Sequence, residues 1–294
     1  MCGIIGIASN KPVSINIINS LKKLEYRGYD SAGLATIQNN EINEKKCSGR
    51  VVELEKILFK SPSDGNLGIG HVRWATHGIP NIINAHPHST DIVSVVHNGI
   101  IENSNELKKK LELKGLKFKS QTDTEVITLL ITEALKKNEA IDSVFKTLKQ
   151  LKGSFALGII FKNHQNIIIG ARRGSPLAVG YSKNENYLGS DSYALKSMTN
   201  KISYLDDGDL CVLSKDKVDF YDVNQKKINK KIYTVSDDEN TTDKGDYKNF
   251  MSKEIFEQSN TIKKCLSEYT DSLKKDINIY NFPIEPKKIN KIIL

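Results

Sequence analysis

The sequence has few of the features that mark metal-binding, secreted or membrane-spanning proteins. Its four cysteines form no Cys-x-x-Cys pair, and no group of histidines has the spacing of a zinc site. No apolar run approaches the roughly 18 residues of a membrane span, and the N-terminus lacks the charged lead and apolar core of a signal peptide. We therefore expect a cytoplasmic protein without a metal or cofactor, in which Cys2 stays a free thiol.

The chain is basic, with a formal net charge of +8 over 294 residues. Its lysines are scattered, and basic runs such as 108–110 and 227–231 have no interleaved aromatic side chains. This pattern is typical of solvated faces, so we expect neither nucleic-acid nor membrane binding. An anionic substrate or partner stays open.

Hydrophobic periodicity predicts short strands on both sides of a helical block. Apolar residues at helical spacing predict a first helix over 13–24, and they are Ile15, Ile18, Leu21 and Leu24. Further helices are predicted over 106–114, 126–137, 141–151 and 250–266. Strands are predicted over 4–7, 34–37, 67–74, 91–96, 155–161, 167–171, 177–181, 210–213 and 218–221. The order favours an α+β fold with packed sheets and helices outside, and the polar, acidic stretch 237–246 predicts a linker.

Cys2 is the strongest candidate for a reactive group. If Met1 is removed, one residue carries both a thiol and a free α-amine, whose ordinary pKa of about 8 suits a local base. Gly3 and Gly6 leave room around the sulfur, and the isoleucines between them predict a buried strand. The alternative is a cysteine that follows Met on a buried first strand, because cysteine is a common buried residue.

A polar cluster follows the strand predicted over 67–74. Arg73 is a bidentate donor suited to a carboxylate, and Thr76 and His77 add further donors beside Trp74, the single tryptophan. The alternative is a strand-end arginine in a surface ion pair and a tryptophan in the core.

Two further polar groups have a functional and a structural interpretation. The amide of Asn98 and the N–H of Gly99 could face a developing oxyanion, whereas the Asn-Gly pair itself favours an ordinary turn. Asp123 could pair with a substrate ammonium, or it could favour a helix N-terminus. His86 and His88 are interpreted as residues that order a loop rather than bind metal. Taken together, the thiol, the carboxylate binder, the oxyanion donors and the ammonium binder fit a substrate that is an amino acid with an acyl side chain. Glutamine is the natural candidate.

Six motifs, in order, resemble the glutaminase domain of the glucosamine-6-phosphate synthases, also called glutamine–fructose-6-phosphate aminotransferases (isomerising). The resemblance covers almost the whole chain. The motifs occupy residues 1–6, 24–33, 73–78, 84–88, 96–103 and 122–125.

The resemblance implies a class II glutamine amidotransferase with the fold of N-terminal-nucleophile hydrolases, a four-layer αββα sandwich with two stacked antiparallel sheets. It implies glutamine hydrolysis with Cys2 as nucleophile and with Asn98 and Gly99 as the oxyanion hole. Trp74 matches the family's gate on an ammonia channel. The remaining implied residues hold the glutamine or support its pocket: Arg73, Thr76, His77, Asp123, His86 and Arg27.

The resemblance also predicts the domain organisation. Residues 2–236 match the glutaminase domain, and 237–294 match a linker and helical segment that leads toward a sugar-isomerase domain absent from this sequence. In the full-length family members that domain binds fructose 6-phosphate, receives the ammonia to make glucosamine 6-phosphate, and carries most of the homo-oligomer interface. We therefore expect the chain to be a truncated form.

Two alternatives stay open from the sequence. The same glutaminase domain could serve a phosphoribosylamine-forming or asparagine-forming synthase, which the motifs at 29–33, 74–77 and 253–255 argue against. The chain could instead be a catalytically silent glutamine sensor or scaffold, which the joint presence of Cys2, Arg73 and Asp123 argues against.

Overall fold

A computed structural model describes residues 2–235, 245–248, 250–271 and 276–277. The chain divides into two compact units, residues 1–237 and 238–294. Of the predicted linker 237–246, the part up to residue 244 lies outside the described residues, and so does the tail after residue 277. The predicted domain boundary at 236/237 therefore stays a prediction.

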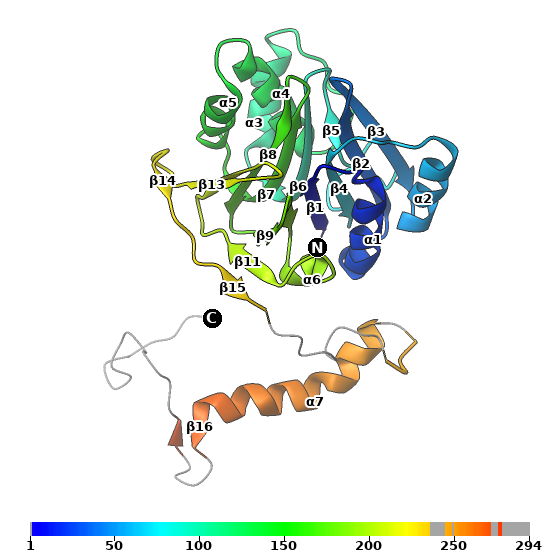
Figure 1. Cartoon of the computed structure of the whole chain (residues 1–294), viewed down its shortest axis with the longest axis vertical. Coiled ribbons are helices and arrows are strands. Elements are labelled where there is room, and N and C mark those ends of the chain that lie inside the picture. The colour runs from blue at the N-terminus through cyan, green and yellow to red at the C-terminus, as the bar shows by residue number, and fades with distance from the viewer. Residues whose placement is uncertain (1, 236–244, 249, 272–275, 278–294) are drawn as a thin grey trace. The chain divides into compact units, whose positions relative to one another are not determined.

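The first unit contains two sheets whose strand pairs are all antiparallel (Figure 1). Sheet A has eight strands, in the spatial order β15 (Tyr233–Thr234), β11 (Lys201–Tyr204), β9 (Ala178–Ser182), β10 (Glu185–Gly189), β1 (Gly3–Ala8), β4 (Leu67–Arg73), β2 (Ser31–Gln38) and β3 (Glu41–Ser48). Sheet B has seven strands, in the order β14 (Lys227–Ile228), β13 (Val218–Tyr221), β12 (Leu210–Leu213), β8 (His164–Arg173), β7 (Gly153–Phe161), β6 (Val93–Ile101) and β5 (His88–Ser89).

Helices cover the outer face of each sheet (Figure 1). The helices on sheet A are α1 (Ser14–Leu24), α2 (Val51–Lys60) and α6 (Ser192–Leu195), with a short 3-10 helix at Glu25–Arg27. The helices on sheet B are α3 (Ser104–Glu112), α4 (Thr124–Leu135) and α5 (Ala140–Leu148). This confirms the predicted αββα sandwich with two stacked antiparallel sheets.

The layers follow from the alternation of side chains along the central strands. On β1, Ile4 packs into the core between the two sheets, whereas Ile5 and Ile7 pack against the helices of sheet A. On β6, Val96 lies between the sheets and Val95 faces the helices of sheet B. Because both faces of these strands are covered, they are apolar on both sides, and their alternation is hidden in the sequence.

Some local predictions need correction. Ile15 is 74% exposed, because the buried face of α1 uses Ile17 and Ile18 instead. The Asn98-Gly99 pair forms no turn: β6 continues through it to Ile101 and pairs with β7 throughout. The second strand begins at Ser31, three residues earlier than predicted.

Several elements were not predicted, among them β3, β10, β11, α2 and α6. Strand β3 lies at the edge of sheet A and is rich in glutamate and lysine, a composition that protects an edge but gives no apolar alternation. Helix α2 buries only Val51 and Leu54, so its apolar stripe is short.

The second unit contains α7 (Phe250–Tyr269) and a two-stranded sheet of β16 (Thr270–Asp271) and β17 (Asp276–Ile277). The helix agrees with the one predicted over 250–266. Within the described residues, no helix is both long enough and apolar enough to span a membrane.

The packing between the sheets predicts which truncated side chains lower the free energy of unfolding most. Ile69 is fully buried in the core between the sheets. We expect Ile69→Ala to lower the free energy of unfolding by about 2–5 kcal/mol, because the truncation leaves a cavity. Ile15→Ala, at the exposed site on α1, is the matched control and should change it by less than about 0.5 kcal/mol. Urea unfolding of both variants measures this, and equal effects would contradict the assigned layers.

Candidate active site

Cys2 lies immediately before β1, in the middle of sheet A. The register pairs Gly3 with Val72, so Cys2 faces the end of β4. The backbone N–H of Trp74 donates to the Cys2 sulfur at 3.3 Å, and the thiol lies 3.5 Å from the Trp74 carbonyl oxygen. The backbone of Trp74, directly after β4, therefore contacts the sulfur through both its N–H and its carbonyl oxygen.

The loop before β2 holds this chain segment in place. Asp30 accepts a hydrogen bond from the Ala75 N–H at 2.8 Å through its carboxylate, and its own N–H donates to the Arg73 carbonyl at 3.1 Å. A Cβ on Gly28 would lie 2.5 Å from the Arg73 carbonyl carbon, so this close approach requires glycine. The two-glycine loop was visible in the sequence, but the segment against which it packs was not.

The Cys2 thiol is held in its neutral form. Burial raises the pKa of Cys2 above its ordinary value, and the Trp74 N–H and the Arg73 guanidinium offset this only in part. A neutral thiol is a weak nucleophile, so the sulfur needs a base beside it before it can attack.

Asn98 and Gly99 come from the other sheet, on β6. The Asn98 side-chain amide donates through Nδ2 to the Cys2 carbonyl oxygen at 2.9 Å. Gly99 has a φ of +134°, and a Cβ there would lie 2.1 Å from the Ser154 carbonyl oxygen, so no other residue fits. Cys2 and Asn98 are thus brought together by the stacking of two sheets, and Gly99 follows Asn98 on β6.

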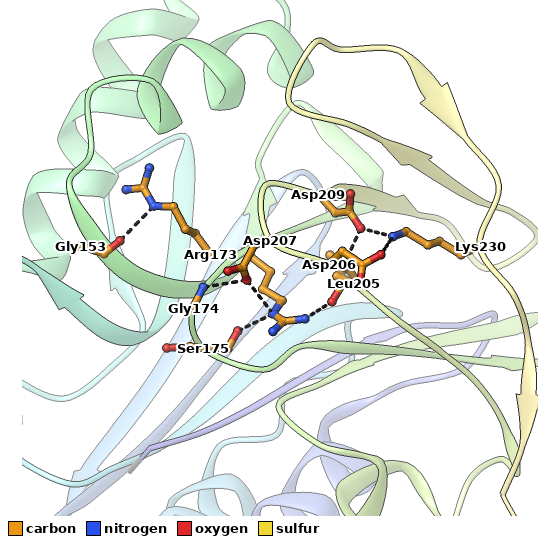
Figure 2. Close-up of polar contacts among 10 residues, drawn as sticks. Gly153, Arg173, Gly174, Ser175, Leu205, Asp206, Asp207, Asp209 and Lys230 are labelled. Atoms are coloured by element: carbon orange, nitrogen blue, oxygen red, sulfur yellow. Dashed lines mark hydrogen bonds and ion pairs between the residues drawn. The ribbon is translucent and has the colours of Figure 1, made fainter. Parts of the chain in front are cut away.

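The strand that pairs with Gly99 is itself anchored by arginine. Gly99 pairs with Phe155 near the start of β7, and Arg173 donates to the Gly153 carbonyl at 2.9 Å (Figure 2). The same guanidinium lies 4.6 Å from the Phe155 ring centroid. Figure 2 also shows a separate contact nearby, in which Lys230 bridges Asp206 and Asp209.

The Arg73 side chain is buried and turned toward the loop that follows β4. Its guanidinium donates to the carbonyl oxygens of His77, Gly78 (3.3 Å) and Ile79 (3.4 Å). The group therefore keeps its charge inside the site while it shapes the loop.

Asp123 approaches the site from the start of α4. It is the N-cap residue of α4, yet its carboxylate makes no capping bond and instead accepts from the Ile101 N–H on β6 at 2.8 Å. Asp123 and Arg73 lie near enough to Cys2 to act on its thiol in opposite directions: the carboxylate raises its pKa and the guanidinium lowers it. A carboxylate and a guanidinium therefore both lie near the sulfur.

Thr76, His77 and Trp74 lie on the exposed loop after β4. The Thr76 hydroxyl is 3.4 Å from His77 Nδ1. Trp74 is 45% exposed and meets Tyr29 edge-on, with ring centroids 6.2 Å apart. A single tryptophan in the core, the structural alternative considered for Trp74, is excluded by this exposure.

Arg27 makes its contacts away from the sulfur. Its guanidinium forms an ion pair with Asp191 at 2.6 Å, and it pairs with no other acidic side chain in the part of the chain that the structure describes. The Tyr26 hydroxyl donates to the same carboxylate, whose other oxygen caps α6 through the Ala194 N–H. Arg27 thus ties the loop before β2 to α6.

Four histidines form a buried cluster beside Asn98, which the sequence did not predict as a unit: His71, His86, His88 and His97. His86 is stacked on His71 with ring centroids 4.2 Å apart. The Thr124 hydroxyl lies 2.8 Å from His86 and 2.9 Å from His97. Burial lowers the pKa of all four rings, that of His71 to about 3. No cluster with the makings of a metal site occurs among the described residues.

Comparisons with known proteins agree on one class of enzyme. Residues 84–197 match the family model described as a glutamine amidotransferase domain. A relative from Mesorhizobium japonicum, named glutamine–fructose-6-phosphate aminotransferase [isomerizing], is 45% identical over 100% of this chain and 49% of its own length. A relative of the same name from Brucella abortus is 44% identical with the same coverage. The chain therefore spans about half the length of the curated relatives it matches.

A solved structure shows the same fold. The glutamine phosphoribosylpyrophosphate amidotransferase of B. subtilis, complexed with ADP and GMP, matches with a TM-score of 0.67 at 24% identity, over 76% of this chain and 49% of that chain. Together with the two antiparallel sheets, this match confirms the predicted N-terminal-nucleophile type of fold.

The raised pKa of Cys2 predicts how the thiol reacts while Met1 is retained. A raised pKa leaves less thiolate at neutral pH, so we expect iodoacetamide to modify Cys2 more slowly at pH 7 than it modifies a short peptide thiol. Above the ordinary thiol pKa of about 8.5 the peptide rate levels off, whereas the Cys2 rate keeps rising. Mass spectrometry of the Cys2 peptide measures both rates. A rate ratio that is constant with pH would indicate steric shielding alone.

Proposed function

We propose that this chain, which belongs to the glutamine–fructose-6-phosphate aminotransferase family of glutamine amidotransferases, hydrolyses L-glutamine to glutamate and ammonia. The observation that carries the proposal is the hydrogen bond from the Asn98 amide to the Cys2 carbonyl oxygen at 2.9 Å, which brings an N–H donor to the residue that carries the thiol. A thiol beside a preorganised amide donor is the pairing that acyl transfer from a carboxamide requires.

The reaction begins once Met1 has been removed. The α-amine of Cys2 takes the thiol proton, and the sulfur attacks the side-chain carboxamide carbon of glutamine. The amine passes the proton to the departing nitrogen, the C–N bond breaks, and ammonia leaves a γ-glutamyl thioester on Cys2. Water then attacks the thioester, and glutamate is released with the thiol restored. The raised thiol pKa supports the need for this internal base.

The tetrahedral intermediates carry a negative oxygen. Asn98 Nδ2 and the Gly99 N–H are the donors that we assign to it. Such donors act mainly in the transition state, where they are worth about 3 kcal/mol each. The positive φ of Gly99 supports its role, because only glycine keeps the backbone open at this point.

The charged groups beside Cys2 suit the amino-acid end of glutamine. We assign the α-carboxylate to Arg73 with Thr76 and His77, and the α-ammonium to Asp123. A cationic and an acidic side chain near the sulfur suit a zwitterion whose side chain reaches the nucleophile. His86 and Arg27 support the pocket from behind, through Thr124 and Asp191 respectively.

The longer protein would use the ammonia. We propose that it passes the ammonia to fructose 6-phosphate and forms glucosamine 6-phosphate, with Trp74 as a gate beside Cys2. The names of the relatives support the transfer of ammonia to fructose 6-phosphate. The position of Trp74 supports its role as a gate, because its side chain is exposed while its backbone N–H donates to the Cys2 sulfur. We also propose that the longer protein is cytoplasmic and homo-oligomeric, and that it binds neither nucleic acid nor a membrane.

Glutamate release tests the glutaminase proposal. We expect the chain with Met1 removed to release glutamate from glutamine, and Cys2→Ala to abolish release because no thioester can form. Cys265→Ala is the matched control, since this exposed thiol lies on α7, and it should leave the rate unchanged. A coupled glutamate assay measures all three proteins. Release by Cys2→Ala, or equal release by a chain that retains Met1, would refute the mechanism.

A further inference from the structure

A buried histidine of sheet A bonds directly to the oxyanion residue of sheet B. His71 lies on β4 opposite Ile4 of β1, so it shares the face that Ile4 turns toward sheet B. Its Nε2 lies 3.1 Å from Asn98 Oδ1 and 3.0 Å from the His97 carbonyl oxygen, both on β6. These contacts join the two sheets beside Cys2.

The partners fix which nitrogen of His71 carries the proton. The His97 carbonyl oxygen can only accept, so Nε2 must be the N–H of the ring. The Asn98 atom beside this N–H must then accept as well, which makes it the oxygen. The Cys2 carbonyl oxygen leads to the same assignment from the other end, because it needs the amide nitrogen of Asn98. The orientation of the amide therefore follows from two backbone carbonyls, which cannot be flipped.

The orientation matters because an amide has a donor end and an acceptor end of nearly the same shape. With its nitrogen toward Cys2, Asn98 offers an N–H to a developing oxyanion. With the amide reversed, its oxygen would face both the oxyanion and the Cys2 carbonyl, and both contacts would be repulsive. Because the final torsion of asparagine is soft, a partner is needed to exclude the reversed form.

The surroundings of His71 keep it in this one form. Burial lowers the pKa of His71 to about 3, so the ring is neutral at pH 7. Nδ1 has no hydrogen-bond partner within the residues that the structure describes, and the ring is stacked on His86. A second proton on Nδ1 would be a buried charge without a partner, which is strongly unfavourable.

We propose that His71 is a positioning residue for glutamine hydrolysis: it holds the Asn98 carboxamide with its N–H toward Cys2, and it does not touch the substrate. The inference rests on the proposed glutaminase function. It gives a role to a polar ring that is completely buried between the two sheets.

Two substitutions with side chains of similar length separate the effect of the His71 N–H donor from the effect of packing. His71→Met fills the space without an N–H, whereas His71→Gln keeps an N–H at a similar reach. We expect His71→Met to lower kcat about 10- to 100-fold with KM for glutamine within about twofold, since the oxyanion forms only after binding. His71→Gln should recover most of the loss. His88→Gln is the matched control, because His88 is buried in the same cluster but bonds to Thr122, and it should stay within about twofold.

A double-mutant cycle tests whether the effect passes through Asn98. Asn98→Ala alone should lower kcat by about 100-fold or more. In that background His71→Met should cost less than about twofold further, because no amide remains to be oriented. An equal loss in both backgrounds, an unchanged kcat in His71→Met, or a loss confined to KM would overturn the proposal.

The tautomer can be measured without any variant. In nitrogen-15 spectra of the wild-type protein at pH 7, His71 should appear as the neutral Nε2–H form. An Nδ1–H form or an imidazolium overturns the proposal, even if His71→Met does not fold. Wild-type protein that releases no glutamate would refute the proposed function instead, and the spectrum then decides the role of His71 in holding Asn98.

Discussion

The site depends on one hydrogen bond between the two sheets, from the Asn98 amide to the Cys2 carbonyl oxygen. Cys2 is carried by the centre of sheet A and Asn98 by sheet B, and the two residues are 96 positions apart in the chain. Their distance is set by how closely the sheets stack, and that spacing is set by the apolar side chains between them, such as Ile4, Ile69 and Val96. Because interiors are densely packed, such a core can keep two polar groups in fixed positions.

The same arrangement explains why part of the fold was visible in the sequence and part was not. Strands such as 155–161 and 210–213 were predicted because their apolar runs are short and bounded by turn residues. The Asn98-Gly99 pair was interpreted locally as a turn, but pairing with β7 along its whole length overrides that preference. Strand β3 was missed because the charges that protect a sheet edge remove the periodic signal.

The candidate site was predictable to the extent that it is built from motifs. Cys2, Arg73, Asn98 and Asp123 were selected from the sequence, and the structure brings these four together. Their supports were not predictable, because they depend on contacts between distant segments. Nothing in the sequence places the backbone of Gly28 against Arg73, or directs the ring of His71 at Asn98.

The buried histidine cluster also makes the domain sensitive to acid. In the folded protein all four rings have lowered pKa values, whereas in the unfolded chain each titrates near 6.5. Below about pH 6.5 the unfolded chain therefore binds more protons, and each ring lowers the free energy of unfolding by up to about 1.4 kcal/mol per pH unit until its folded pKa is reached. The four imidazoles that are buried and neutral at pH 7 therefore favour unfolding once the solution becomes acidic.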